Sequence, residues 1–188
     1  MKKVLIAYAV EREKIALSFK DCTIDYVYTG VGKVASSIAL MDAIDRYQPD
    51  LVLNIGTAGA LRHAIGTIKV CTHFIDRDFQ KEPALELNFE LDSKDLLLSS
   101  GFCNTWDVDG ICNTGDSFVT SLSDATHDDV FEMEAFAEAS VCAFKKRPFV
   151  AIKYVTDIIG QNSLKLWEDK LADARTELTT FFADKEVL

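Results

Sequence analysis

The sequence predicts an α/β fold in which helices pack on both faces of a largely parallel central sheet. Two observations support this prediction. Apolar runs of strand length alternate with segments whose apolar residues recur at helical spacing, an order that is typical of βαβ units. The 188 residues are 48% hydrophobic and 27% charged, the composition of an ordinary globular protein. We therefore interpret residues 1–188 as a single domain.

Each predicted element follows from its local pattern. Short runs rich in Val, Ile, Leu and Tyr, two of them just after Pro49 and Pro148, predict strands at KVLIAYA (3–9), TIDYVYT (23–29), DLVLNI (50–55), GTIKVCTHFI (66–75), DVDGICNT (107–114) and FVAIKYVTD (149–157). Helical spacing predicts helices at VEREKIALSF (10–19), GKVASSIALMDAIDRY (32–47), DSKDLLLSS (92–100), the later part of FEMEAFAEASVCAF (131–144) and Ser163–Phe182. The polar stretches Arg77–Pro83 and Ser121–Asp129 are predicted loops.

Composition excludes several classes of function. The net charge is −10 and no basic cluster exceeds Lys145–Arg147, so we expect no nucleic-acid partner and no binding to anionic membranes. The apolar run after Lys3 is too short for a signal peptide or a membrane span. The five cysteines are odd in number, scattered and without a CxxC pair. They predict reduced thiols in a cytoplasmic protein, with no disulfide frame and no metal site.

Ligands of α/β sheets bind where strands end and helices begin, and three such places are rich in small residues. Thr29–Lys33 (TGVGK) follows a predicted strand, but it matches neither the dinucleotide fingerprint nor the Walker loop. Gly56–Ala60 (GTAGA) offers exposed backbone and a hydroxyl at Thr57, and Gly115–Val119 (GDSFV) offers an aromatic ring beside backbone. Alone, the first stretch is better explained as a structural turn, close packing explains the second about equally well, and a core phenylalanine is the common alternative for the third.

Carboxylates stand at two further strand ends. FEMEAFAEA contains Glu132, Glu134 and Glu138 among apolar residues, although glutamate is rarely buried without a partner. Asp157 ends the apolar run FVAIKYVTD, where burial would favour the protonated carboxyl that a general acid needs. The simpler alternatives are glutamates facing water at the start of a helix and an aspartate that caps the next helix.

In this order the motifs resemble those of the nucleoside phosphorylase/hydrolase superfamily, and within it the 5′-methylthioadenosine/S-adenosylhomocysteine nucleosidases. The matching stretches, which span Met1 to about Asp157, are AVERE, TGVGKVA, NIGTAGAL, TGDSFV, EMEAFA and RPFVAIKYVTD. The combination of EMEA with a later strand ending in Thr-Asp is specific to this superfamily. The resemblance implies a three-layer αβα sandwich with a mixed central sheet, and cleavage of the N-glycosidic bond of a purine nucleoside without a cofactor.

The resemblance also implies roles for individual residues. Asp157 would act as general acid at the purine N7, and Glu134 would bind the ribose hydroxyls and stabilise the cationic sugar. Glu13 would activate the attacking water, with Glu11 as the alternative if the register slips. The substrate-binding residues implied by the matching motifs are Thr57, which would help to hold the water, Ala58 and Gly59 beside it, Met133 against the ribose, Glu132, Phe118 stacked on the base, Val119 reading the base edge through its backbone, Lys153 and Thr156.

Water is the expected nucleophile. The phosphorylases of the superfamily hold phosphate with arginines, one of them just before the GTAG stretch, whereas the strand here reads LVLNI and leaves only Lys33 as a candidate. Burying a phosphate dianion without an arginine partner would be costly. Lys153 replaces the arginine that is usual in the nucleosidases, and lysine cannot form a bidentate fork.

Several alternatives stay open. The chain is short for the family, with a reduced segment at Cys22–Thr29 and another between GTIKV and GDSF, where relatives shape the pocket for the 5′ substituent. A futalosine hydrolase, a purine nucleoside phosphorylase and a nucleoside-binding protein without turnover therefore remain alternatives to the methylthioadenosine type. The resemblance further implies a homodimer in which the neighbouring subunit closes part of the pocket. Within FEMEAFAEA we expect Glu132 to support its neighbours and Glu138 to face solvent or a partner.

Overall fold

The computed structural model of the chain describes residues 1–82, 84, 86–119, 129–161, 163–183 and 185–187. The predicted loop Ser121–Asp129 lies outside these residues except for its last residue. The strands are β1 (Lys2–Tyr8), β2 (Cys22–Tyr28), β3 (Leu51–Ala60), β4 (Ile68–Asp76), β5 (Glu90–Asp92), β6 (Gly110–Thr114), β7 (Val130–Glu132) and β8 (Phe149–Ile158). The helices are α1 (Lys33–Tyr47), α2 (Arg77–Gln80), α3 (Lys94–Ser99), α4 (Ala135–Lys145) and α5 (Ser163–Ala183), with a 3₁₀ turn at Glu11–Glu13.

The strands form one mixed sheet in the order β2-β1-β3-β7-β6-β4-β5, and β8 pairs with both β3 and β4. The pairs β1–β2, β1–β3, β3–β8, β4–β6 and β6–β7 are parallel, whereas β3–β7, β4–β5 and β4–β8 are antiparallel. The pairings β3–β8–β4–β6–β7–β3 therefore close into a ring. This closure brings the ends of β3, β7 and β8, which carry Thr57, Glu132 and Asp157, to one place.

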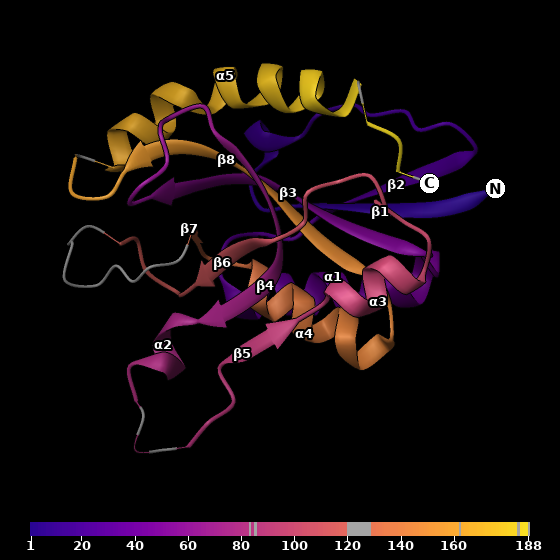
Figure 1. Cartoon of the computed structure of the whole chain (residues 1–188), viewed down its shortest axis with the longest axis horizontal. Coiled ribbons are helices and arrows are strands. Elements are labelled where there is room, and N and C mark those ends of the chain that lie inside the picture. The colour runs from indigo at the N-terminus through magenta and orange to yellow at the C-terminus, as the bar shows by residue number, and fades with distance from the viewer. Residues whose placement is uncertain (83, 85, 120–128, 162, 184, 188) are drawn as a thin grey trace.

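Helices cover both faces of the sheet, as the sequence predicts (Figure 1). Val4 and Ile6 of β1 point into a core that also holds Leu178 and Phe182 of α5. Leu5, between them, points into a second core with Leu40 of α1 and residues of α4. This alternation within β1 is the period of two that a strand imposes on its side chains. None of the helices in the described part of the chain is long and apolar enough to cross a membrane.

The prediction of a helix at residues 10–19 is wrong. Only Glu11–Glu13 forms a 3₁₀ turn, and the chain then runs without helix to β2. Ile15 and Phe19 are buried and Leu17 is partly buried, while the residues between them are exposed. This period of two indicates extended chain, so the segment lies along the α5 side of the sheet as an irregular strand-like stretch.

Two other boundaries differ from the prediction. The stretch Gly56–Ala60 is not a turn after β3 but continues that strand, because β8 pairs with β3 as far as Ala60, with a bulge between Ala58 and Gly59. The predicted loop at 77–83 begins with the single-turn helix α2, whose N-terminus is capped by the Asp76 carboxylate. Its Pro83 lies outside the described residues.

Candidate active site

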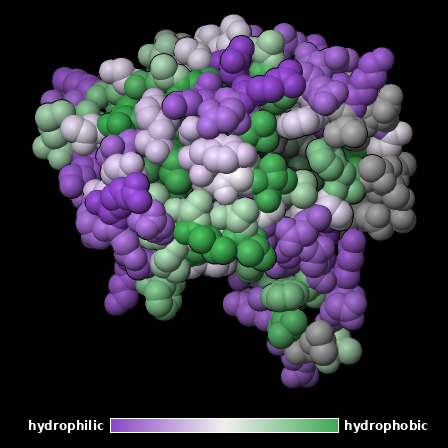
Figure 2. Space-filling view, turned by 180° about the vertical axis from the view of Figure 1, so that it is seen from behind, coloured by the Kyte–Doolittle hydropathy of each residue, from purple (hydrophilic) through white to green (hydrophobic). Residues whose placement is uncertain are grey.

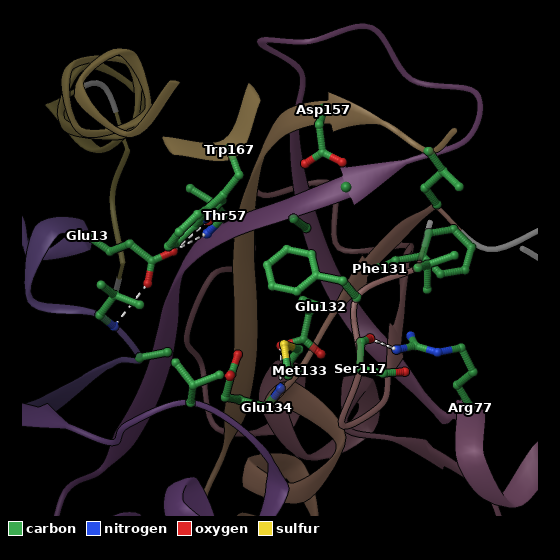
Figure 3. A pocket seen from close by; sticks show the side chains of 18 residues that line it. Glu13, Thr57, Arg77, Ser117, Phe131, Glu132, Met133, Glu134, Asp157 and Trp167 are labelled. Carbon is green, nitrogen blue, oxygen red and sulfur yellow. Dashed lines mark hydrogen bonds between the residues drawn. The ribbon is translucent and has the colours of Figure 1, made fainter. Parts of the chain in front are cut away.

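A pocket opens where β3, β7 and β8 end, and three carboxyl groups lie on different sides of it (Figure 3). Glu13 comes from the 3₁₀ turn, Asp157 from β8, and Glu134 from the junction of β7 and α4. The wall also includes Thr57, Ala58, Gly59, Phe118, Val119, Glu132 and Met133. The structure thus brings these distant parts of the sequence into one cavity.

Glu13 is buried against β3. Its Oε1 accepts hydrogen bonds from the Thr57 backbone amide (2.9 Å) and the Thr57 hydroxyl (2.6 Å), and its Oε2 accepts one from the Val10 amide (3.2 Å). A Cβ atom on Gly56 would lie 3.2 Å from Oε1, so the glycine leaves room for the carboxylate. Burial raises the pKa of Glu13, while the Thr57 hydrogen bonds and Lys153 oppose that rise.

Asp157, in β8, pairs with Gly59 of β3. Its Oδ1 accepts a hydrogen bond from the Thr156 hydroxyl (2.9 Å), and that hydroxyl also lies 3.3 Å from the Ala58 carbonyl. A Cβ atom on Gly59 would stand 2.9 Å from Oδ2 of Asp157, a distance that real Cβ atoms avoid. Gly59 therefore leaves the space that the Asp157 carboxyl group occupies. Because α5 begins only at Ser163, Asp157 is not the cap of that helix.

Glu134 stands at the first turn of α4, with Met133 beside it on the pocket wall. Its Oε1 accepts a hydrogen bond from the amide of Gly32 (2.9 Å), which has φ of +92°, a value that favours glycine. The TGVGK stretch therefore contacts the EMEA stretch directly. Burial and the neighbouring Glu132 charge raise the pKa of Glu134 to about 8.

Glu132, in the pocket wall, forms an ion pair with Lys153 behind it. Their side chains are 2% and 3% exposed, and Nζ of Lys153 lies 3.1 Å from Oε2 of Glu132. The same Oε2 accepts the backbone amides of Glu134 (2.9 Å) and Ala135 (2.8 Å), so it anchors the start of α4. Although burial opposes ionisation of Glu132, Lys153 and these hydrogen bonds leave its pKa below the usual value. Burial lowers the pKa of Lys153, but the negative charge of Glu132 has a larger opposite effect, so the pKa is raised.

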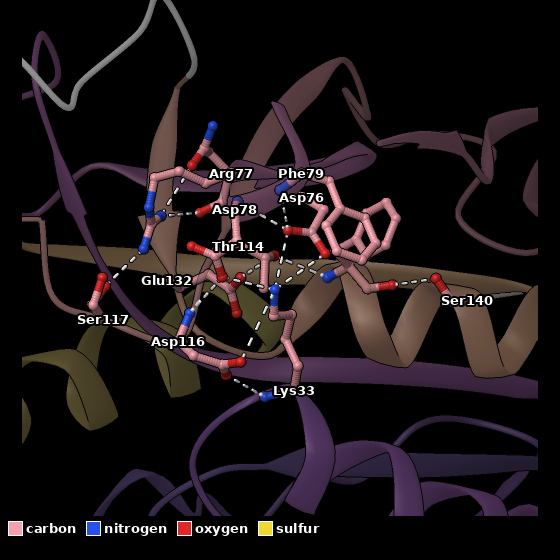
Figure 4. Close-up of polar contacts among 12 residues, drawn as sticks. Lys33, Asp76, Arg77, Asp78, Phe79, Thr114, Asp116, Ser117, Glu132 and Ser140 are labelled. Atoms are coloured by element: carbon pink, nitrogen blue, oxygen red, sulfur yellow. Dashed lines mark hydrogen bonds and ion pairs between the residues drawn. The ribbon is translucent and has the colours of Figure 1, made fainter. Parts of the chain in front are cut away.

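One part of the pocket wall is mostly aromatic. Phe118, Val119 and Phe131 line it, and the ring of Phe118 meets Trp167 of α5 edge-on with 6.2 Å between centroids. Arg77 also lines the pocket, and its buried side chain donates to the Asn113 side chain (2.9 Å) and to the Ser117 carbonyl (2.6 Å) (Figure 4). A Cβ atom on Gly115 would lie 2.5 Å from Nη2 of Arg77. Arg77 thus holds the backbone that leads into Phe118.

Lys33, the only candidate phosphate ligand noted in the sequence, is neutralised by acidic neighbours. Its Nζ lies 3.0 Å from Oδ1 of Asp76 and 2.7 Å from Oδ2 of Asp78, and the Asp116 carboxylate is 3.9 Å away (Figure 4). The ion pairs of Lys33 with these carboxylates connect α1 with α2 and with the turn after β6. Lys33 also does not line the pocket.

The predicted site residues fall into two groups. Ten of them line the pocket: Glu13, Thr57, Ala58, Gly59, Phe118, Val119, Glu132, Met133, Glu134 and Asp157. Lys153 and Thr156 lie behind the wall and contact Glu132 and Asp157. The sequence interpretation missed Phe131, Arg77 and Trp167, which also line the pocket; Phe131 directly precedes the EMEA motif, which was the one available signal.

The prediction that Glu138 is exposed is wrong. We expected it to face solvent or a partner, but it is fully buried in α4, where the Asn54 and Thr29 side chains act on its carboxyl group. The cause is that α4 packs between α1 and the sheet and buries residues on more than one side, Ala137 and Ala139 among them. Burial raises the pKa of Glu138 to about 7, and Lys153 opposes the rise.

We expect Glu138→Gln to flatten the pH dependence of stability. A carboxyl whose pKa is about 7 in the folded state stabilises the fold fully below pH ~4.5, and this contribution is lost as pH rises through about 7. By ~1.4 kcal/mol per pKa unit the loss is of the order of 3 kcal/mol. Urea unfolding at pH 5 and pH 8 measures it. The exposed Glu168→Gln is the control, and equal pH slopes in Glu138→Gln and the unmodified chain would refute the assignment.

Comparisons with known proteins identify the family. The phosphorylase superfamily profile matches residues 14–184. A 5′-methylthioadenosine/S-adenosylhomocysteine nucleosidase of Bacillus subtilis (strain 168) is 30% identical over 173 residues, covering 80% of this chain and 75% of that protein. The nucleosidase of Colwellia psychrerythraea in complex with adenine aligns with a TM-score of 0.80 at 24% identity, over 97% of this chain and 93% of the other.

A futalosine hydrolase mutant of Helicobacter pylori aligns with a TM-score of 0.76 at 18% identity, over 97% of both chains. These structural likenesses confirm the predicted α/β fold with its mixed sheet. Together with the profile match and the Bacillus subtilis relative, they also confirm the resemblance read from the motifs. The chain belongs to the phosphorylase superfamily.

Proposed function

We propose that the protein hydrolyses the N-glycosidic bond of a purine nucleoside modified at its 5′ position, of the methylthioadenosine or S-adenosylhomocysteine type. The observation that carries the proposal is the placement of Glu13 and Asp157, two buried carboxyl groups on different sides of one pocket, with Glu134 on a third (Figure 3). The Bacillus subtilis relative named above is a nucleosidase for these substrates.

In the proposed reaction, Asp157 donates a proton to N7 of the purine as the bond between C1′ and N9 breaks and its electrons pass to the base. Glu134 binds the ribose hydroxyls, and in its ionised form it stabilises the cation-like sugar. A water held by Thr57 attacks C1′ while Glu13 takes its proton. Phe118 stacks on the base, Val119 contacts the base edge and Met133 packs on the ribose. Free purine and the ribose derivative leave.

The hydrogen bonds that Thr57 of the GTAG stretch makes to Glu13 support water as the nucleophile. Both donors of Thr57, its amide and its hydroxyl, bind the Glu13 carboxylate. A phosphate at this place would lose those donors and meet a like charge, which is unfavourable in a buried site. Lys33 is paired with Asp76 and Asp78, so it does not supply the missing cation.

Lys153 supports the site indirectly in this proposal. It neutralises Glu132, and Glu132 fixes the backbone amides of Glu134 and Ala135. The lysine that replaces the expected arginine thus acts through Glu132 and α4, and the missing bidentate fork does not remove a substrate contact.

A substrate panel tests the proposal. The protein is incubated with methylthioadenosine, S-adenosylhomocysteine, futalosine, inosine or adenosine, and release of free base is followed by chromatography. We expect release from the two sulfur nucleosides. Preferential release from futalosine would support the alternative suggested by the Helicobacter pylori likeness. No release from any of them would leave a nucleoside-binding protein and contradict the proposal.

We also propose that the protein forms a homodimer in the cytoplasm. Val34 and Ile38 are exposed on one side of α1, and Val31, which lines the pocket, is exposed beside its start. Apolar surface is also visible among polar surface on the face opposite that of Figure 1 (Figure 2). The five cysteines are free thiols, which fits a reducing compartment. A monomer by light scattering, or the protein found outside the cytoplasmic fraction, would contradict this.

A further inference from the structure

Trp167 makes a polar contact with a residue of the proposed active site, although the proposed reaction gives Trp167 no role. It lies in α5, lines the pocket, and its indole Nε1 donates a hydrogen bond to Oγ1 of Thr57 (2.8 Å). That hydroxyl donates in turn to Oε1 of Glu13 (2.6 Å). The three side chains therefore form a chain from the C-terminal helix to the carboxylate at the pocket, as Figure 3 shows.

The direction of this chain is fixed by chemistry. An indole N–H can only donate, whereas a threonine hydroxyl has one hydrogen and can rotate to donate elsewhere. Because Trp167 donates to the Thr57 oxygen, the hydroxyl must accept there, and its single hydrogen is directed to Glu13. The Thr57 amide donates to the same carboxylate oxygen (2.9 Å). Glu13 is thereby held as an acceptor.

We propose that Trp167 is a positioning residue that orients the Thr57 hydroxyl toward Glu13, and so favours the ionised form of Glu13 and directs it toward the attacking water. This rests on the proposed function, in which Glu13 is the base. Hydrogen bonds to the charged form of a buried carboxyl favour that form. The charge of Lys153 of β8 also lowers the pKa of Glu13, but the same lysine interacts with Glu132 and Glu134. The hydrogen bonds that Thr57 and Val10 donate to Glu13 are therefore important for keeping its pKa down.

The test uses Trp167→Phe, which keeps an aromatic ring against Phe118 but removes the donor. The matched control is Trp106→Phe, because the Trp106 indole also donates a hydrogen bond, to the Glu186 carbonyl (2.8 Å), outside the pocket. In Trp167→Phe we expect the acidic limb of the kcat/KM profile with methylthioadenosine to move to higher pH by about 0.5–1 unit, with KM nearly unchanged. The profile of Trp106→Phe should keep its position.

A double-mutant cycle with Thr57→Val separates positioning from packing. If Trp167 acts through Thr57, adding Trp167→Phe to Thr57→Val should lower kcat/KM by less than about twofold further. A purely structural role would instead lower kcat/KM equally at every pH and add fully to Thr57→Val, and that result would overturn the inference.

A readout without turnover keeps the inference separate from the proposed function. In Trp106→Phe, Trp167 is the only tryptophan, so its fluorescence reports on its own surroundings. We expect the emission to change with pH at a midpoint that disappears in Trp106→Phe combined with Glu13→Gln. If the midpoint stays in that double variant, Trp167 does not sense Glu13 and the inference fails, whether or not the substrate panel shows activity.

Discussion

Asp157→Asn is expected to lower kcat for base release by about 10²–10⁴-fold, the usual contribution of a general acid. Asparagine has nearly the same shape, and its carbonyl oxygen can still accept the hydrogen bond from the Thr156 hydroxyl. It cannot transfer a proton to the leaving purine. Initial rates of base release at saturating substrate measure the effect, and the thermal midpoint shows whether the fold is intact.

The control for this prediction is Asp95→Asn, an equal change at an exposed position of α3. It should leave both the rate and the thermal midpoint unchanged. Near-normal turnover in Asp157→Asn would remove Asp157 from the role of general acid. Loss of activity together with a fall in the thermal midpoint would instead show that Asp157 supports the fold where β8 crosses Gly59.

Lys153→Met is expected to cost about 3–5 kcal/mol in the free energy of unfolding at neutral pH, the usual effect of leaving a buried charge without its partner. The variant fills similar space but leaves the Glu132 carboxyl group without its cation in an interior where both side chains are nearly inaccessible. Because native domains are stable by only about 5–15 kcal/mol, this is a large fraction. Urea unfolding followed by circular dichroism gives the value.

The pH dependence and two companion variants make this prediction specific. Without Lys153, burial raises the pKa of Glu132, so the variant should lose stability as pH rises through that pKa and lose less below it. Glu132→Gln in the same chain removes the unpaired charge and should recover part of the loss, and Lys153→Arg should retain more stability than Lys153→Met. A change below about 1 kcal/mol in Lys153→Met would show that the pair contributes little.

The order of motifs in the sequence was enough to predict the fold class and to select the carboxylates that the structure gathers in one pocket. Motifs at strand ends are local, and a parallel sheet brings strand ends together. The glycines of GTAGA were ambiguous in the sequence, since close packing explained them equally well. The structure gives a reason for two of them: Gly56 leaves space for Glu13 and Gly59 for Asp157.

What the sequence could not predict depends on contacts between distant residues. Trp167 meets Thr57 across 110 positions, and Arg77 meets Asn113 across 36, so neither contact leaves a local pattern. Glu138 follows Glu134 by one helical turn, and only the packing of α4 against α1 and the sheet decides that it is buried. The helix prediction for residues 10–19 is wrong for a different reason: the apolar residues Ile15, Leu17 and Phe19 alternate as in an extended chain, and this pattern was interpreted as helical spacing.

Hydrolysis by a Glu13-activated water is the central claim, and the fate of the sugar in the presence of phosphate tests it most directly. The protein is given methylthioadenosine in buffer with and without a large excess of phosphate, and the products are followed by ³¹P magnetic resonance and mass spectrometry. We expect the free ribose derivative in both buffers, base release at equal rates and no new phosphorus signal. Base release that requires phosphate and yields a sugar 1-phosphate would contradict the account.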